Sequence, residues 1–267
     1  MDKYEVLKEY RKQDDRILLS QILDKLESSK KREKIEYTDF LDMYQVGLVK
    51  KFLNKIQVIN YILYGGYEDS ERNVAIFYPE SYTDEMVKKN YDKILKIIRI
   101  SLSKEDEGKY SHRNYLGGIV KLGMKREKVG DILVTKSGAD IIVKDETAEI
   151  LAKELETLTR FQNSKIEVLN IGQIRNPEIK LEYVEIIVPS FRLDNIVSDL
   201  ARTSRSKAVQ ILEQERVFIN GQNETKPSKS VKIGDTITIR GKGRFVVKQL
   251  KGSTRSGRFV LEIEKYV

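Results

Sequence analysis

The first part of the chain repeats its hydrophobic positions with a helical period. One predicted face collects Ile17, Leu18, Ile22, Leu23 and Leu26, and a second collects Phe40, Leu41, Tyr44, Leu48 and Phe52. Apolar residues three and four positions apart line one side of an α-helix. Thr38 or Asp39 is the expected N-cap of the second helix. The pattern therefore predicts a helical segment over residues 1–58.

Between residues 59 and 188 the pattern changes to short β-branched and aromatic runs. Two such runs, residues 57–66 and 72–79, flank a turn-rich segment and predict a hairpin. Further strand-like runs surround two helical stretches, one of which starts after Ser111, an expected helix cap. Strands interleaved with two helices are typical of an α+β sandwich of the ferredoxin or RNA-recognition-motif kind. We predict that fold for this middle segment.

The last segment predicts a small α/β module over residues 189–267, after a strand-like run bracketed by two prolines. Its first helix places Leu193, Ile196, Val197 and Leu200 on one face. Ser204 is a good N-cap for a second short helix. The next strand ends at Asn220-Gly221, two residues that tolerate positive φ in tight turns. Two final apolar runs predict a terminal hairpin. The whole chain is thus expected to be an α+β protein of three parts.

The charge of the chain is concentrated in this last segment. The net charge is +8. Residues 190–267 carry 16 Lys and Arg against 8 Asp and Glu, whereas residues 1–189 carry 33 of each sign. The entire positive excess therefore lies in the last 78 residues. Such segregation is typical of a module that binds a polyanion.

Two cations occupy an unexpected place in this module. Arg205 and Lys207 fall in the first turn of the second predicted helix, where the helix dipole disfavours positive charge and the open N–H groups attract anions. We infer that an anion lies between these cations and the helix end, and that a phosphate takes this position. Glycines beside three further cations suit close approach to a sugar–phosphate chain. The predicted RNA contacts are Arg192, Arg202, Ser204, Arg205, Lys207, Arg240, Lys242 and Arg244.

The same stretch resembles the S-four RNA-binding module, named for a small-subunit ribosomal protein. The similarity rests on an Arg-Leu-Asp opening at residues 192–194, Ser204-Arg205 with Ala208, a Val-x-x-Asn-Gly motif at residues 217–221, and Gly234-Asp235. These positions extend over about fifty residues. The sequence departs from the family at Glu215-Arg216, where the module usually has glycine.

Residues 110–134, together with the Arg-Gly-Lys-Gly-Arg run at residues 240–244, resemble the YlmH-like proteins, which are bacterial cytoplasmic proteins with this module at the C-terminus. The resemblance implies a ribosome-associated RNA-binding protein without catalytic chemistry. It implies structured ribosomal RNA as the ligand, on the ribosome or its large subunit, with tRNA as a further candidate. Related stand-alone modules recognise obstructed subunits that still carry a nascent chain, which implies a role in translation quality control.

Catalytic alternatives find little support in the residues. The chain has no cysteine and one histidine, which excludes thiolate chemistry and a multi-histidine metal site. Pseudouridine synthases carry a catalytic aspartate in an Arg-Leu-Asp context, but too few residues follow Asp194 for such a domain. We predict a structural role for Asp194, paired with a neighbouring arginine. Gly65 and Gly66 fit a methyltransferase cofactor loop badly. We predict no catalytic residue, metal or cofactor. An RNA-modifying active site in the middle domain and a cell-division-linked adaptor stay open as alternatives.

A second RNA contact is a candidate in the middle domain, at His112, Arg113, Lys125 and Arg126. These residues lie at a helix start and in a turn, where a solvated loop is the competing interpretation. The charged N-terminus does not resemble a secretory signal, and no apolar run approaches the ~20 residues that cross a membrane. The expected protein is a cytoplasmic monomer without a membrane partner.

Overall fold

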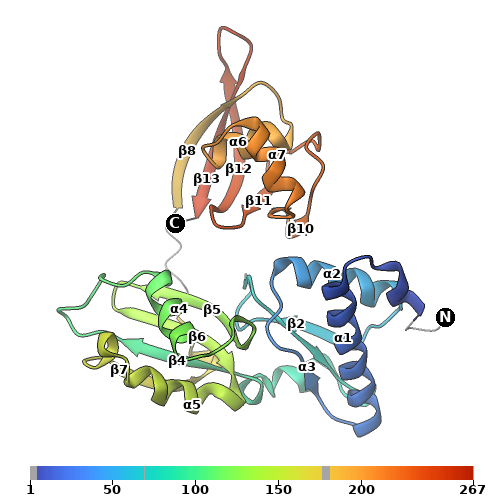
Figure 1. Ribbon diagram of the computed structural model, residues 1–267, viewed down its shortest axis with the longest axis vertical. Coiled ribbons are helices and arrows are strands. Elements are labelled where there is room, and N and C mark those ends of the chain that lie inside the picture. Colours follow the sequence, from blue (N-terminus) through green and yellow to red (C-terminus); the bar gives the residue numbers. More distant parts are fainter. Residues whose placement is uncertain (1–4, 69, 176–180, 267) are drawn as a thin grey trace. The chain divides into compact units, whose positions relative to one another are not determined.

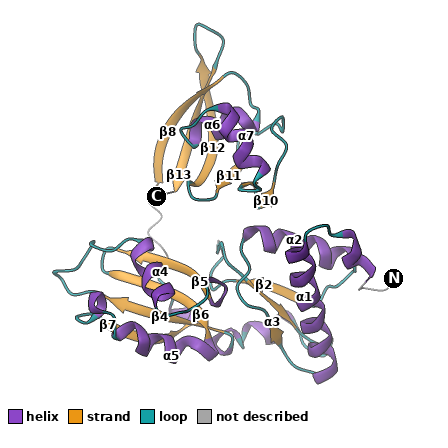
Figure 2. Ribbon diagram, in the orientation of Figure 1, coloured by secondary structure: helices purple, strands orange, loops and turns teal. Residues whose placement is uncertain are grey.

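A computed structural model describes residues 5–68, 70–175 and 181–266 (Figure 1). The chain divides into two compact units, Met1–Pro177 and Glu178–Val267, and each is described by itself. The mixture of helices and strands in Figure 2 confirms the α+β class. In the part of the chain that the structure describes, every helix is too short or too polar to span a lipid bilayer.

The first layer of unit 1 packs helices on a small sheet. It contains η1 (Glu5–Glu9), α1 (Gln13–Arg32), α2 (Met43–Lys55), α3 (Asp84–Lys88), η2 (Tyr91–Lys93), β1 (Glu36–Tyr37), β2 (Tyr61–Tyr64) and β3 (Val74–Phe77), with strand order β1-β3-β2. The apolar face predicted for the first helix is largely buried, with Leu19, Ile22, Leu23 and Leu26 fully covered. They pack with α2 and with Ala75 and Phe77 of β3.

The N-cap of α2 is Asp42, so the expected cap at Thr38 or Asp39 is wrong. Asp42 accepts a hydrogen bond from the Gln45 backbone N–H at 3.0 Å, and the Gln45 side chain bonds the Asp42 N–H at 2.9 Å. Thr38 instead pairs with Ala75 through its backbone and its hydroxyl. The carboxylate of Asp39 pairs with two lysines. Thr38 and Asp39 are therefore bound to tertiary partners, and neither of them caps the helix.

The second layer of unit 1 has the predicted ferredoxin-like topology. Its elements are β4 (Leu95–Ser101), α4 (His112–Lys121), η3 (Arg126–Lys128), β5 (Val129–Thr135), β6 (Gly138–Lys144), α5 (Asp145–Glu156), η4 (Thr159–Phe161), β7 (Lys165–Asn170) and η5 (Ile171–Gln173). The strands form an antiparallel sheet in the order β5-β6-β4-β7. Ser111 caps α4 with Asn114, as expected. This βαββαβ order is the split unit of ferredoxin-like folds.

The two faces of this four-stranded sheet have different partners. Ile98 and Ile141 point to the face that α4 and α5 cover. Ile97 and Ile142 point to the other face and are fully buried against Phe40 and the strand β3. The predicted hairpin β2–β3 exists, but it belongs to the N-terminal sheet. The expected division at residue 59 therefore does not follow the sheets, because this hairpin pairs within the N-terminal sheet, with one face on α1 and α2 and the other on the ferredoxin-like sheet.

Gly130 sits where the two layers meet and leaves no room for a side chain. A Cβ there would lie 2.6 Å from Phe40 Cε1 and 3.2 Å from Ile142 Cβ.

Gly130→Ala should therefore lower the free energy of unfolding by about 1–3 kcal/mol through overpacking. Gly117→Ala is the matched control, because its added methyl meets nothing within 4 Å on α4. It should stabilise the chain by about 0.5–1 kcal/mol. Urea unfolding of both variants checks the pair, and equal effects would contradict the packing account.

Unit 2 is a sheet with two helices on one face. It contains β8 (Leu181–Val188), α6 (Leu193–Leu200), α7 (Arg205–Glu213), β9 (Val217–Ile219), β10 (Gln222–Asn223), β11 (Thr236–Ile239), β12 (Gly243–Ser253) and β13 (Phe259–Tyr266). The strand order is β10-β9-β11-β12-β13-β8, and every pairing is antiparallel. Helices α6 and α7, orange in Figure 1, share one apolar core with the sheet. The predicted terminal hairpin is β12–β13.

Strand β8 corrects the expected domain boundary near residue 189. All eight of its residues pair with β13, so this strand belongs to unit 2 rather than to the middle domain.

The turn before β9 also explains a departure from the S-four pattern. Glu215 has a left-handed backbone with φ of 57°, the conformation in which glycine carries no steric penalty. The backbone of the turn is kept although the glycine is not.

Candidate nucleic-acid interface

The N-terminal end of α7 is built around a buried carboxylate on the neighbouring helix. Ser204 caps α7, as predicted, by accepting a hydrogen bond from the Lys207 N–H at 3.3 Å. Asp194, in the first turn of α6, is 1% exposed. Its backbone N–H donates to the Pro227 carbonyl, and the Leu193 N–H donates to the Lys229 carbonyl. The start of α6 is therefore fixed to the 227–230 loop, which places the carboxylate firmly.

Two arginines converge on the Asp194 carboxylate. The Arg192 Nε lies 3.1 Å from Oδ1 and its Nη2 lies 2.9 Å from Oδ2. The Arg205 Nε and Nη2 lie 2.9 and 2.8 Å from Oδ2. The side chains of Arg192 and Arg205 are 39% and 59% exposed. We call these three residues the arginine brace. It confirms the predicted pairing of Asp194 with a neighbouring arginine.

The brace changes the interpretation of the cations at the start of α7. Burial alone would raise the pKa of Asp194, but hydrogen bonds from Arg192 and Arg205 outweigh it and the pKa is lowered. Asp194 is thus a stable anion beside the start of α7. The anion that the sequence required there is, at least in part, the protein's own carboxylate, and Arg192 and Arg205 are not unpaired cations. One carboxylate still leaves the brace with one net positive charge.

Each braced guanidinium keeps donors for a ligand. An arginine has five N–H donors, and the bonds to Asp194 engage only Nε and Nη2 of each side chain. The two Nη1 groups lie outside these bonds, on side chains that remain partly exposed. A guanidinium locked in this way loses less conformational entropy when it binds a phosphate. The brace is therefore a pre-ordered cationic surface.

Lys207 and Arg202 extend this surface. Both residues are exposed, and neither has an ion-pair partner among the described residues. Arg202 follows the end of α6 in the left-handed region, with φ of 50°. Together with the brace, they place four cations and one carboxylate around the α6–α7 connection. This group matches the first part of the predicted contact set.

The other predicted contacts lie on the opposite face of the sheet. Ile237 and Ile239 point into the core beneath α6 and α7. Because side chains alternate along a strand, Thr238 and Arg240 point away from the helices. Arg244 is paired with Thr238 and shares that outer face. The predicted contacts therefore do not share one face of the sheet, and the alternation of Ile237 and Ile239 was the signal that could have shown it.

The candidate second contact in unit 1 is only partly available. His112, Arg113 and Lys125 are exposed. Desolvation of the imidazole and then the nearby charge of Arg126 lower the pKa of His112, although the residue as a whole is exposed. Arg126 has a structural role instead. Its Nη1 donates to the Val129 and Gly130 carbonyls, and burial lowers its pKa to about 10.

The ferredoxin-like sheet is also closed to one common mode of RNA binding. RNA-recognition motifs stack bases on aromatic residues of their four-stranded sheet. Here the corresponding face presents Ile97 and Ile142, both fully buried under the N-terminal layer. RNA contact by this unit would therefore have to use its helices or loops.

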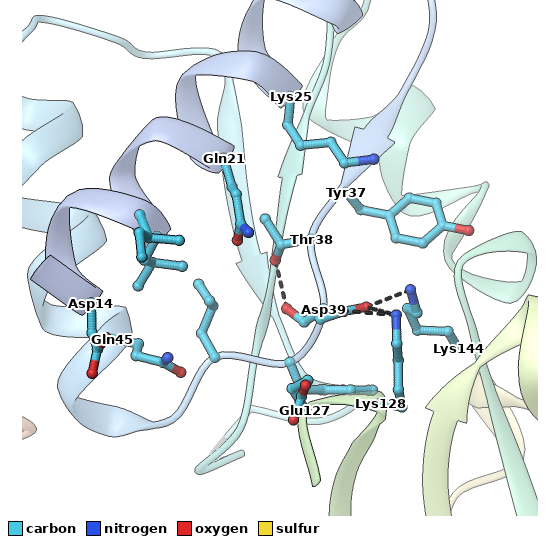
Figure 3. A pocket seen from close by; sticks show the side chains of 14 residues that line it. Asp14, Gln21, Lys25, Tyr37, Thr38, Asp39, Gln45, Glu127, Lys128 and Lys144 are labelled. Carbon is cyan, nitrogen blue, oxygen red and sulfur yellow. Dashed lines mark hydrogen bonds and ion pairs between the residues drawn. The ribbon is translucent and has the colours of Figure 1, made fainter. Parts of the chain in front are cut away.

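Unit 1 also contains a cavity of about 590 Å³ between α1 and the loop that follows β1. Figure 3 shows Lys128 and Lys144 meeting Asp39 on one of its sides. Burial would raise the pKa of Asp39, but hydrogen bonds from Lys144 and Lys128 lower it. Glu146 is a second partner of Lys144 at 2.5 Å. Because carboxylates match these lysines, the cluster joins two layers of the fold rather than forming an anion site.

Two parts of the chain match known RNA-binding domain families. Residues 88–173 match the family described as a putative RNA-binding domain in YlmH, and residues 191–237 match the S4 domain. The chain is 27% identical over 261 residues to the ribosome-associated protein quality control protein P2 of Bacillus subtilis, which covers 98% of each chain. It is 46% identical over 56 residues to the small ribosomal subunit protein uS4 of Trichlorobacter lovleyi, covering 21% of this chain and 27% of that protein.

A solved structure titled cell division protein ylmH, from Streptococcus pneumoniae, is similar to part of the chain. It has a TM-score of 0.47 and 18% identity, and it covers 62% of this chain and 98% of that one.

A sheet with a braced pair of arginines at a helix start, inside an S4 match, defines an RNA-binding protein with a C-terminal S4 domain. A domain that matches the family described as a putative RNA-binding domain in YlmH precedes it. The chain is therefore similar to the YlmH-like proteins in both of these domains, in line with the resemblance of its sequence.

Proposed function

We propose that this protein binds structured ribosomal RNA on the large ribosomal subunit, without catalysis, in the quality control of obstructed subunits. The observation that carries the proposal is the arginine brace at the start of α7, inside the S4 match. Folded RNA is recognised mainly by shape and by its phosphates and 2′-hydroxyls. Pre-ordered guanidiniums beside an exposed lysine suit that kind of contact.

The comparisons support the choice of the ribosome. The relative from Bacillus subtilis is named as ribosome-associated and as a quality control protein, and its similarity extends over 98% of both chains. The second relative is itself a ribosomal protein, and its similarity extends over 56 residues. We extend the ribosomal setting to this chain and propose tRNA as a further RNA ligand. The proposed site of action is the cytoplasm, and the proposed active form is a monomer.

Sedimentation through sucrose gradients tests the proposal. The full-length protein should migrate with isolated large subunits at low salt and return to the top of the gradient at high salt, because phosphate contacts are exchanged for counterions. Isolated small subunits should carry little of it. Migration with small subunits alone would mean that the subunit is wrongly assigned. Protein that stays at the top with both subunits at low salt would contradict the proposal.

A further inference from the structure

The hairpin β12–β13 ends in a turn that lies at the far end of the sheet of unit 2. Strand β12 pairs with β11 only as far as Val246, and beyond that residue β13 is its one strand partner in the described part of the chain. The hairpin continues to the pair Ser253–Phe259. Figure 1 shows the turn, in red, at the projecting end of this ribbon. Residues 254–258 are therefore accessible to a large partner.

Hydrogen bonds around Thr254 give this turn a defined shape. The Thr254 N–H donates to the Arg258 carbonyl at 2.8 Å, and the Gly257 N–H donates to the Thr254 carbonyl at 2.9 Å. The Thr254 hydroxyl accepts from the Arg258 N–H at 3.1 Å and bonds the Ser256 hydroxyl at 2.9 Å. Gly257 has a left-handed backbone, with φ of 78°. The side chains of the turn therefore start from an ordered backbone.

The lysines on the strands of this hairpin are matched by carboxylates. Lys251 lies 2.8 Å from Glu185 of β8 and 2.9 Å from Glu262 of β13. Lys248 pairs with Glu264 at 3.2 Å. Because the sheet already supplies anions to these lysines, they contribute little net positive charge to a surface that would attract a polyanion.

The two arginines of the turn have no such partners. Arg255 and Arg258 are both exposed, and within the described part of the chain neither guanidinium forms a hydrogen bond or an ion pair. Burial raises the pKa of Asp199 on α6, and the charge of Arg258 opposes that shift without a contact between the two side chains. Among the described residues, all five N–H donors of each guanidinium are therefore left for a ligand.

The base of the turn is fixed to the helix side of the sheet. The ring of Phe259, which follows Arg258, packs on the ring of Phe191 with 5.2 Å between their centroids. Phe191 directly precedes Arg192 of the arginine brace. Both rings lie against the apolar core that the sheet shares with α6 and α7. The turn therefore starts from the side of unit 2 that carries the brace.

We propose that the turn at residues 254–258 is a further RNA contact, in which Arg255 and Arg258 bind backbone phosphates of ribosomal RNA. The inference rests on the proposed function for the identity of the RNA. A guanidinium offers two parallel N–H groups to one phosphate. An ordered backbone also reduces the entropy that is lost when the turn binds.

The composition of the turn favours RNA over an acidic protein. Residues 251–258 are Lys, Gly, Ser, Thr, Arg, Ser, Gly and Arg, without an aliphatic or aromatic side chain. Protein–protein interfaces depend on buried aromatic and apolar anchors at their centre. Contacts to a nucleic-acid backbone use arginines, hydroxyls and backbone N–H groups instead. The turn supplies the second set of groups and lacks the first.

Binding of the full-length protein to isolated large ribosomal subunits at several salt concentrations tests this contact. The double variant Arg255→Ala, Arg258→Ala should bind about tenfold more weakly, with a salt slope shallower by about 1.5, because two phosphate contacts are lost. Its melting temperature should hold, since neither guanidinium has a partner among the described residues. The control Arg16→Ala, Arg32→Ala removes the same charge from exposed positions of α1. It should change the affinity by less than about twofold, since distant charge is screened.

The outcomes separate this inference from the proposed function. Equal losses in the two double variants would mean that net charge alone is responsible, and the turn would not be a contact. Unchanged affinity and slope for Arg255→Ala, Arg258→Ala, while the wild-type protein still migrates with large subunits, would contradict the turn and leave the proposed function intact. Wild-type protein that binds neither subunit would contradict both.

A second measurement reports on the position of the turn without removing its arginines. The chain has no cysteine, so Ser253→Cys, at an exposed position beside the turn, gives one site for an iron–EDTA label. Hydroxyl radicals from this label should cleave ribosomal RNA at discrete positions when the protein is bound. Wild-type protein carried through the same labelling should give no cleavage. Labelled protein that binds large subunits but leaves their RNA intact would overturn the inference.

Discussion

Replacing Asp194 with alanine should weaken RNA binding about tenfold or more, even though the change makes the protein more positive. Charge counting alone predicts the opposite result, because a carboxylate near the RNA is removed. In the structure, however, this carboxylate fixes both Arg192 and Arg205. Without it, each guanidinium would have to be ordered again on binding, and that entropy would be lost from the affinity.

The same variant should lower the free energy of unfolding by about 1–3 kcal/mol, since hydrogen bonds to a charged group are lost. RNA binding is therefore measured well below the melting temperature of the variant. Asp199→Ala is a useful comparison. It removes an exposed carboxylate from α6 that no arginine of the brace contacts. It should leave affinity unchanged or raise it slightly. Tighter RNA binding by Asp194→Ala would contradict the brace.

Asp140→Ala should destabilise unit 1 by about 3–5 kcal/mol, the usual effect of removing one partner of a buried ion pair. Asp140 is 1% exposed and bonds Arg99 through both oxygens, at 2.8 and 2.7 Å. It also accepts from the Arg175 N–H at 3.0 Å. The Arg99 side chain is only 15% exposed. After the substitution its charge would remain largely buried without this carboxylate.

A double variant separates the charge effect from the packing effect. Arg99→Met with Asp140→Leu replaces both charges by apolar side chains, which is often neutral or less costly than breaking the pair. Urea unfolding should therefore rank the double variant above Asp140→Ala in stability. If Asp140→Ala lowers the free energy of unfolding by less than about 1 kcal/mol, the Arg99–Asp140 ion pair does not stabilise unit 1 as its burial predicts.

Local features of the chain could be predicted from the sequence because nearby residues determine them. The Ser204 and Ser111 caps are read within one helical turn, and the Asn220-Gly221 turn needs two residues that accept positive φ. The ferredoxin-like order followed from the succession of strands and helices. A helix cap cannot be predicted in this way where the candidate residue has a tertiary partner instead. Thr38 bonds Ala75 and Asp39 pairs with Lys144, so neither caps α2.

The sequence indicated which residues belong to the candidate interface, but it did not indicate how they are arranged. The sequence identified Arg192, Arg205 and Asp194, but only the packing of α6 against α7 brings Arg205 to a carboxylate eleven positions away. The placement of Arg240 and Arg244 on the outer face was missed because charge was counted without following the alternation of the strands.

The central claim is that cations at the start of α7 neutralise RNA phosphates, and salt dependence tests it most directly. The association constant for large ribosomal subunits is measured at several salt concentrations, for the wild-type protein and for Arg205→Ala with Lys207→Ala. The logarithm of the constant should fall linearly with the logarithm of salt, by about 0.7–0.9 for each phosphate neutralised. The double variant should bind more weakly with a shallower slope. Its melting temperature should fall, because the buried Asp194 carboxylate loses its two hydrogen bonds from Arg205, so binding is measured well below that temperature. Equal slopes for the two proteins would contradict the claim.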